Sequence, residues 1–156
     1  MIPINEMPDH SRVWIYQSDR KFSDDEVAAI EQKLADFISN WASHGTPLKA
    51  SGAVLYNRFL IILADEDSVK ASGCSIDKSV AFVKQLEKEL KCDFFNRLLI
   101  AYKSGDEIKT FHFAEKDELI SQGKINDNTI IFNNLIQNKA DLLSNWQQRL
   151  SESWLH

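Results

Sequence analysis

The apolar segment from Phe59 to Ala64 restricts the fold of this chain more than any other feature. Its six residues, FLIILA, form the longest uninterrupted apolar run in the sequence. Successive side chains of a β-strand point to opposite faces of the sheet, so a run of this kind is apolar on both faces. The run is far too short to cross a bilayer as a helix. We therefore predict that Arg58–Ala64 is a central strand of a β-sheet.

The composition is that of one ordinary globular domain. The chain has 156 residues, of which 44% are hydrophobic and 26% charged, and these values are typical of a protein with an apolar core. Its five glycines and three prolines fall well below the average usage of about 12% for the two together, which favours long regular elements over loops. We expect residues 1–156 to form a single domain.

Charge and targeting signals exclude several classes of function. The chain has 18 basic and 23 acidic residues and a net charge of −5, which argues against nucleic acid or an anionic membrane as a partner. Its first residues contain neither the basic nor the apolar segment of a secretory signal. The two cysteines, Cys74 and Cys92, form no CxxC pair, which is typical of a reduced, cytoplasmic protein.

Apolar periodicity predicts an alternation of strands and helices along the chain. Strands are expected at Arg12–Ser18, Ala50–Tyr56, Arg58–Ala64, Arg97–Lys103 and Glu107–Phe113, with Thr129–Asn133 as a last strand or a buried turn. Helices are expected from Ser23 to about His44, from within Ser72–Asp77 to about Leu90, at Lys116–Gln122 and from Asn138 to about Leu150. Ser23 and Glu26 form a capping box at the first helix, and Gly45 and Pro47 end that helix.

The first six elements follow the order of the split βαβ, or ferredoxin-like, sandwich. We therefore predict an α+β fold with a βαββαβ core, an added edge strand and C-terminal helices. Another α+β sandwich with the same elements and a different strand order is the alternative.

Short motifs spread over nearly the whole chain point to a family. They are Ser18-Asp19-Arg20, the set Trp41, His44 and Gly45, Ala64-Asp65-Glu66, Ala71–Val80, Asp127–Leu135 and Ser153-Trp154. In these motifs the sequence resembles a family of short, uncharacterised bacterial proteins, some of which carry the label "ABC transporter ATPase". The resemblance implies no established activity, cofactor or catalytic residue.

The label conflicts with the sequence. A P-loop requires the pattern GxxxxGK[ST], whose backbone N–H groups and lysine hold the phosphates. Gly123 is the only glycine followed by a lysine, but the next residue is Ile125 and the earlier glycine position holds Glu118. The chain therefore contains no P-loop.

The segment from Ser72 to Asp77 is the first candidate for chemistry. Cys74 falls at a predicted helix N-terminus, where the helix dipole favours a thiolate. Backbone N–H groups at such a terminus also suit an anion, which makes Ser72, Gly73, Ser75 and Asp77 candidate ligand-binding residues. The structural alternative is a cysteine that packs as a small apolar residue beside a serine cap.

The predicted topology brings further groups to the same edge of the sheet. The first helix and the third strand end there, and the second helix begins there, so we expect His44 and Cys74 to lie within about 10 Å of each other. Asp65 and Glu66 should border the same space, with His10 and Arg12 nearby. A cysteine, a histidine and a carboxylate are the components of a nucleophile, base and orienting group. A helix C-terminus stabilised by His44 is the structural alternative.

Two other clusters are weaker candidates. Asp65-Glu66-Asp67 offers ligands to a hard cation such as Mg²⁺, but alternate side chains of a strand point apart, so a solvated acidic turn is favoured and no metal is expected. Arg20, Arg58 and Arg97, with Asn57, are expected at the opposite sheet edge, where they could contact a carboxylate or phosphate. Surface or capping arginines are the simpler interpretation.

Two functions from different classes remain. The first is a non-enzymatic cytoplasmic module that binds a small molecule or a protein partner without a cofactor, with a homodimer through a sheet face or edge left open. The second is a thiol-dependent enzyme in which Cys74 is the nucleophile, His44 the base and Asp65 or Glu66 the orienting group. We favour the first because none of the catalytic patterns is specific.

We predict that the protein does not bind ATP through a P-loop, because the glycines and the lysine that hold the phosphates are missing. Titration calorimetry with Mg-ATP is expected to detect no specific binding. A micromolar dissociation constant would mean that the ATPase label is right and that the nucleotide is held by another geometry.

Overall fold

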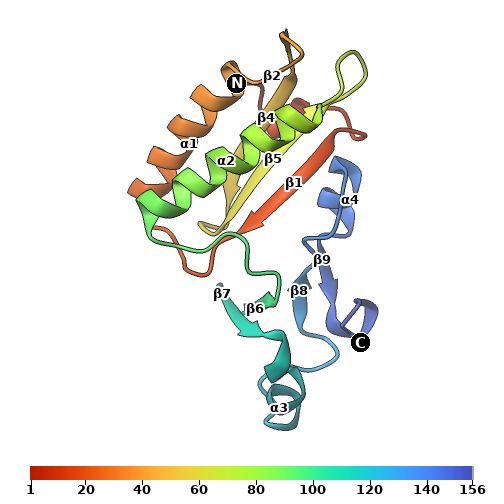
Figure 1. The fold of residues 1–156 in the computed structure, drawn as a ribbon. Helices are drawn as coiled ribbons and strands as arrows, with labels where there is room; N and C mark the ends of the chain where they lie inside the picture. The colour runs from red at the N-terminus through yellow and green to blue at the C-terminus, as the bar shows by residue number, and fades with distance from the viewer. Residues whose placement is uncertain (156) are drawn as a thin grey trace.

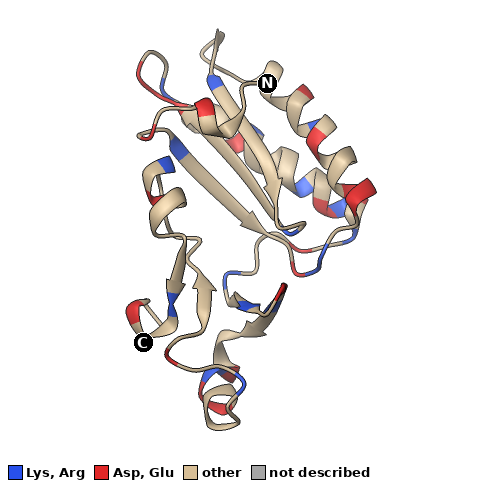
Figure 2. Ribbon diagram, turned by 180° about the vertical axis from the view of Figure 1, so that it is seen from behind, with Lys and Arg blue, Asp and Glu red and all other residues tan. Residues whose placement is uncertain are grey.

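The computed structural model describes residues 1–155, which form two sheets joined after the second long helix (Figure 1). The first sheet has three antiparallel strands in the order β1-β5-β4, which are Arg12–Gln17, Phe59–Asp65 and Lys49–Leu55. Helices α1 (Asp24–Ser39) and α2 (Gly73–Leu90) lie side by side against this sheet. Charged residues lie mainly on the helices, the loops and the strand ends (Figure 2).

The second sheet has four strands in the order β7-β6-β8-β9. These strands are Glu107–His112, Leu99–Ser104, Ile130–Phe132 and Gln147–Arg149. Two short helices, α3 (Lys116–Ser121) and α4 (Lys139–Ser144), connect its strands. A small hairpin of β2 (Ala42–Ser43) and β3 (Thr46–Pro47) follows α1, and 3₁₀ turns lie at Ile4–Glu6, Phe113–Glu115 and Leu150–Glu152. None of the helices in residues 1–155 combines the length and the apolar character that crossing a membrane requires.

Strand β5 is the centre of the fold, as the apolar run predicts. All seven of its residues are buried, and it pairs along its length with β1 and β4. Leu60, Ile62 and Ala64 belong to the core that α1 and α2 cover. Phe59, Ile61 and Leu63 belong to a second core, which also contains Phe132 and Trp146 from the second sheet. One strand therefore contributes to two apolar cores.

The start of α1 is the predicted one, but its end is not. Ser23 and Glu26 form the expected capping box. The helix ends at Ser39, where the Asn40 side chain donates a hydrogen bond to the carbonyl of Asp36. His44 therefore does not lie in a helix's last turn. With Gly45 it forms the β2–β3 turn, and the positive φ angles of the two residues, 50° and 80°, are typical of a tight hairpin.

The other elements of the first sheet agree with their predictions. Tyr56 and Asn57 both have positive φ angles and form the turn between β4 and β5. Ser72 caps α2 by accepting a hydrogen bond from the backbone N–H of Ser75. The helix ends before Lys91, which has a φ of 52°.

The α+β class is correct, but the ferredoxin-like sheet is not completed. The first three strands have the expected order, with the third in the centre, whereas the fourth expected strand, β6, pairs with β7 and β8 in the second sheet. The open edge of β1 instead meets the segment before α4. Val13 donates a backbone hydrogen bond to Gln137, and Arg12 forms a bridge with Asn138. This segment occupies the position that a fourth strand would take.

The C-terminal helix is shorter than predicted. Only Lys139–Ser144 is helical, because the chain then extends as β9 and pairs with β8. Leu143 is 69% exposed, whereas Trp146 is buried in the second core. The tail is anchored by Leu155, which is buried, and not by Trp154, which is 45% exposed.

We predict that Gly52→Ala lowers the free energy of unfolding by about 1–3 kcal/mol, the usual cost of overpacking. A Cβ atom at Gly52 would lie 2.7 Å from the carbonyl oxygen of Ile61 and 2.8 Å from a methyl group of Leu34. Urea denaturation measures the change. Gly73→Ala is the matched control, because a Cβ atom there meets nothing within 4 Å. Equal denaturation midpoints for the two variants would contradict this description of the α1–β4 contact.

Candidate functional site

Asp65 is the centre of a polar cluster at the end of the sheet where β5 ends and β1 begins. Its carboxylate accepts a 3.0 Å hydrogen bond from the backbone of Asp67 and lies 3.4 Å from Nε2 of His10. The ammonium group of Lys49 lies 3.7 Å away. The backbone bond from Asp67 is the largest cause that lowers the pKa of Asp65 below its ordinary value, with His10 and Lys49 adding to it.

Glu66 belongs to the same end but has its own partners. Its carboxylate accepts a 2.8 Å hydrogen bond from the backbone of Ala71 and lies 3.8 Å from the Arg12 guanidinium. Glu66 therefore ties the loop before α2 to the start of β1. The sequence correctly placed His10, Arg12, Asp65 and Glu66 at one edge of the sheet.

His10, Asp65 and Asp67 are the residues of this cluster that could hold a metal ion. One ligand atom from each lies within 4.8 Å of the others. However, Nε2 of His10 already lies 2.9 Å from the Asp67 carboxylate, and Lys49 supplies a positive charge to Asp65. Contacts among these side chains account for their arrangement.

The predicted ligand-binding serines are engaged in capping α2. The Ser72 hydroxyl accepts a hydrogen bond from the backbone of Ser75, and the two hydroxyls lie 3.0 Å apart. The Ser75 hydroxyl also lies 2.9 Å from the Ser72 carbonyl. Gly73, Cys74 and Asp77 are exposed in the first turns of the helix. These hydrogen bonds support the interpretation of the two serines as a helix cap over their interpretation as ligand-binding residues.

The β2–β3 hairpin lies at the same end of the sheet as the start of α2 (Figure 1). The Trp41 indole donates a 2.8 Å hydrogen bond to the Ser75 carbonyl, which attaches the hairpin segment to the helix. Within residues 1–155, however, no hydrogen bond links His44, Cys74 and the two acids, Asp65 and Glu66, to one another. The fold gathers the four residues at one end without assembling a nucleophile, base and orienting group.

We predict that iodoacetamide labels Cys74 at least about tenfold faster than Cys92 in the folded protein at pH 8. Cys74 is exposed, whereas burial raises the pKa of the half-buried Cys92 thiol to about 11. Mass spectrometry of the labelled protein measures both rates. In urea the two rates should converge. Equal rates in the folded state would contradict the difference in environment.

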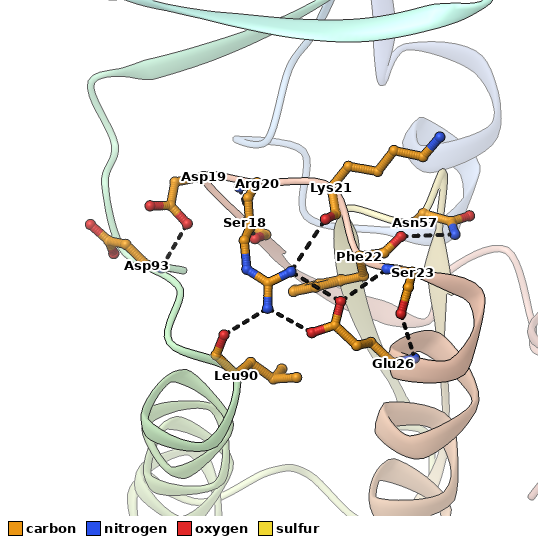
Figure 3. A network of polar contacts seen from close by, with 10 residues as sticks. All are labelled: Ser18, Asp19, Arg20, Lys21, Phe22, Ser23, Glu26, Asn57, Leu90 and Asp93. Carbon is orange, nitrogen blue, oxygen red and sulfur yellow. Dashed lines mark hydrogen bonds and ion pairs between the residues drawn. The ribbon is translucent and has the colours of Figure 1, made fainter.

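Arg20 organises the opposite end of the sheet (Figure 3). Its guanidinium donates to both carboxylate oxygens of Glu26, at 3.0 and 2.7 Å, and to the carbonyl of Leu90 at 2.6 Å. It thereby joins the start of α1 to the end of α2. The hydrogen bond from Arg20 is the main cause that lowers the pKa of Glu26 to about 2. Arg20 is thus a structural clamp, as the simpler interpretation of the sequence holds.

We predict that Glu26→Gln lowers the free energy of unfolding at pH 7 and that its difference from the unmodified protein becomes smaller as the pH falls toward 2. The pKa of Glu26 is lowered from 4.5 to about 2 on folding, so its contribution is present above pH 4.5 and is lost as the pH approaches 2. Glutamine keeps one acceptor oxygen for the Ser23 backbone but replaces the other with a donor, so the variant loses the charge and one of the two acceptors of Arg20. Urea denaturation at several pH values measures the effect, with Glu31→Gln on the same helix as the control. A difference that does not change with pH would contradict the role of the Arg20 pair.

Arg58 differs from Arg20 because its mostly buried side chain has no acidic partner within residues 1–155. The side chain is 9% exposed, and its only hydrogen bond within residues 1–155 is a 3.4 Å contact from Nη1 to the Ser18 carbonyl. No carboxylate in that part of the chain lies within 4.0 Å of it. Burial lowers the pKa of Arg58, and the charge of Asp19 opposes this effect.

The Arg58 pocket is a hollow of about 390 Å³ between the β4–β5 turn and the β6–β7 turn. It is lined by Lys21, Tyr56, Asn57, Arg58, Asp106, Glu107 and Ile108. The Asn57 side-chain amide is already engaged, because it donates hydrogen bonds to the carbonyl of Phe22 and the carboxylate of Asp24. Arg58 and Lys21 remain to receive an anionic group.

Sequence reasoning found part of this pocket. It named Arg58 and Asn57 as candidates for contact with a carboxylate or phosphate, but Arg20 is a clamp and Arg97 is not among the lining residues. The contribution of Asp106 and Glu107 depends on how the second sheet packs against the first, and no local pattern indicates that. A second hollow of about 410 Å³ beside α4 is lined mostly by amide side chains and contains no basic group.

Comparison with known proteins adds no further constraint. No protein-family model, curated protein or solved structure matches this chain. The resemblance to a bacterial family stays a prediction.

Proposed function

We propose that this protein is a small-ligand-binding module that takes an anionic molecule, through a carboxylate or phosphate group, in the Arg58 pocket. One observation carries the proposal. Arg58 is nine-tenths buried, lines a pocket of about 390 Å³ and has no carboxylate partner within residues 1–155.

Burial of a charged side chain such as Arg58 costs free energy. A buried ionic group is normally paired, because desolvation without a partner costs several kcal/mol. Arg20, which is less buried, has a bidentate carboxylate partner, whereas Arg58 has one long hydrogen bond to a neutral carbonyl. A guanidinium presents five donors in a planar fork that matches a carboxylate or phosphate. An incoming anion would supply the missing charge and the missing acceptors together.

The size of the pocket favours a small molecule over a protein segment. Pockets for small ligands usually measure about 300–1,000 Å³, and this one lies near the lower limit. Lys21 adds a second positive charge at the wall. The proposal keeps the sequence-based predictions of a cytoplasmic protein without nucleic-acid or membrane partners.

The thiol-dependent enzyme is the less supported alternative. Asp65 and Glu66 are engaged with His10, Lys49 and Arg12, so neither is free to orient His44. Cys74 is exposed, which permits reaction but does not by itself favour it.

We predict that the protein binds propionate and inorganic phosphate at low ionic strength and that Arg58→Gln weakens this binding at least about tenfold. Titration calorimetry measures the dissociation constants. Lys21→Gln, an exposed substitution that should not affect folding, is expected to weaken binding by a smaller factor.

Arg149→Gln is the matched control, because Arg149 is exposed, pairs with Glu152 and does not line the pocket. It should bind both anions like the unmodified protein. Absence of binding to the unmodified protein, or equal affinities for the Arg58 and Arg149 variants, would overturn the proposal.

A further inference from the structure

The Arg58 pocket contains both signs of charge. Besides Arg58 and Lys21 it is lined by Asp106 and Glu107, which follow Gly105 in the β6–β7 turn. None of the ion pairs within residues 1–155 joins an acid of this turn to either base. Two basic and two acidic side chains therefore line one small space without neutralising one another.

The four charged residues differ in depth, and the most buried of them is basic. Arg58 is 9% exposed, whereas Lys21, Asp106 and Glu107 are all exposed. The buried charge of the pocket is thus positive, and the two acids lie with Lys21 at its mouth. A molecule with a negative group at one end and a positive group at the other would match this order when its negative end enters first.

Tyr56 and Ile108 add uncharged surface to the lining of the pocket. The Tyr56 ring packs within 6.3 Å of the ring centroids of Phe59, Phe132 and Trp146, and its hydroxyl accepts a 2.7 Å hydrogen bond from Gln147. This side of the pocket is held in place by both sheets, and it offers apolar contact to a short aliphatic group.

We propose that the ligand is a zwitterion of the amino-acid type, with its carboxylate at Arg58 and its ammonium group toward Asp106 and Glu107. This inference rests on the proposed function. A ligand with only negative charge would meet the same acids at the mouth, where like charges repel. A ligand with only positive charge would leave Arg58 buried and unpaired. Only a molecule with both charges complements all four side chains.

Titration calorimetry with L-alanine, propionate and ethylamine tests the assignment, since propionate and ethylamine each carry one of the two charged groups of alanine. We expect alanine to bind about fivefold tighter than propionate, the gain of one or two solvent-exposed ion pairs, and ethylamine not to bind. The double variant Asp106→Asn/Glu107→Gln should bind propionate at least as tightly as the unmodified protein and lose the preference for alanine. Asp117→Asn/Glu118→Gln, an adjacent acidic pair on α3 outside the pocket, should retain it.

The outcomes separate this inference from the proposed function. If propionate binds through Arg58 and alanine binds no tighter, or if the Asp106/Glu107 variant keeps the preference, the zwitterion assignment is overturned and the anion site stands. If neither propionate nor alanine binds, the proposed function is overturned as well. Circular dichroism melting curves of the turn variants establish that they fold like the unmodified protein.

Discussion

The burial of β5 on both faces is the constraint on which the rest of the structure depends. Leu60 and Ile62 pack against the helices, while Phe59 and Ile61 pack against the second sheet. Each such side chain contributes roughly 1.5–3 kcal/mol through the apolar surface that it buries. No polar group can be placed along this strand without loss of one core or the other. Polar chemistry is therefore confined to its two ends.

The two ends of the strand are used differently. At the Asp65 end, the acids have partners in His10, Lys49 and Arg12, so the cluster joins β1, β4, β5 and the loop before α2. At the Arg58 end, Arg20 is paired but Arg58 is not. A buried charge without a partner is costly, which is why we place the ligand at this end.

A chain of side-chain hydrogen bonds connects the two sheets. The Trp146 indole donates a hydrogen bond to the side chain of Asn134, and the Asn134 amide donates in turn to Gln17. Both distances are 2.9 Å. The Gln17 amide donates to the carbonyl of Leu99 at the start of β6. These buried and half-buried side chains link the start of β6 to β1 and to the segment around Trp146.

Local patterns predicted much of the fold, and long-range packing decided what they missed. The apolar run, the Ser23 capping box and the Tyr56-Asn57 turn are encoded by neighbouring residues, and all three are correct. The helical pattern after Ser144 fails because Trp146 gains more by packing between the sheets than by continuing a helix. The order β6 beside β8 likewise depends on contacts between distant segments.

The candidate sites follow the same rule. His10, Asp65 and Glu66 could be placed together because strand ends and helix starts meet at one edge, which the predicted order of the first three strands already implies. The helical assignment of His44 was wrong, because a His-Gly pair suits a tight turn equally well and the helix ends at Ser39. Arg58 was named as a candidate, but its lack of an acidic partner is a property of the packed structure alone.

The thermal stability of an Arg58→Met variant, with and without propionate, tests the central claim most directly. If Arg58 is a buried charge kept for a ligand, methionine removes the desolvation cost, and the variant should melt at or above the temperature of the unmodified protein in anion-free buffer. Propionate should then raise the melting temperature of the unmodified protein and leave that of the variant unchanged. A variant that melts well below the unmodified protein, with no effect of propionate on either, would mean that Arg58 is a structural residue and would contradict the account.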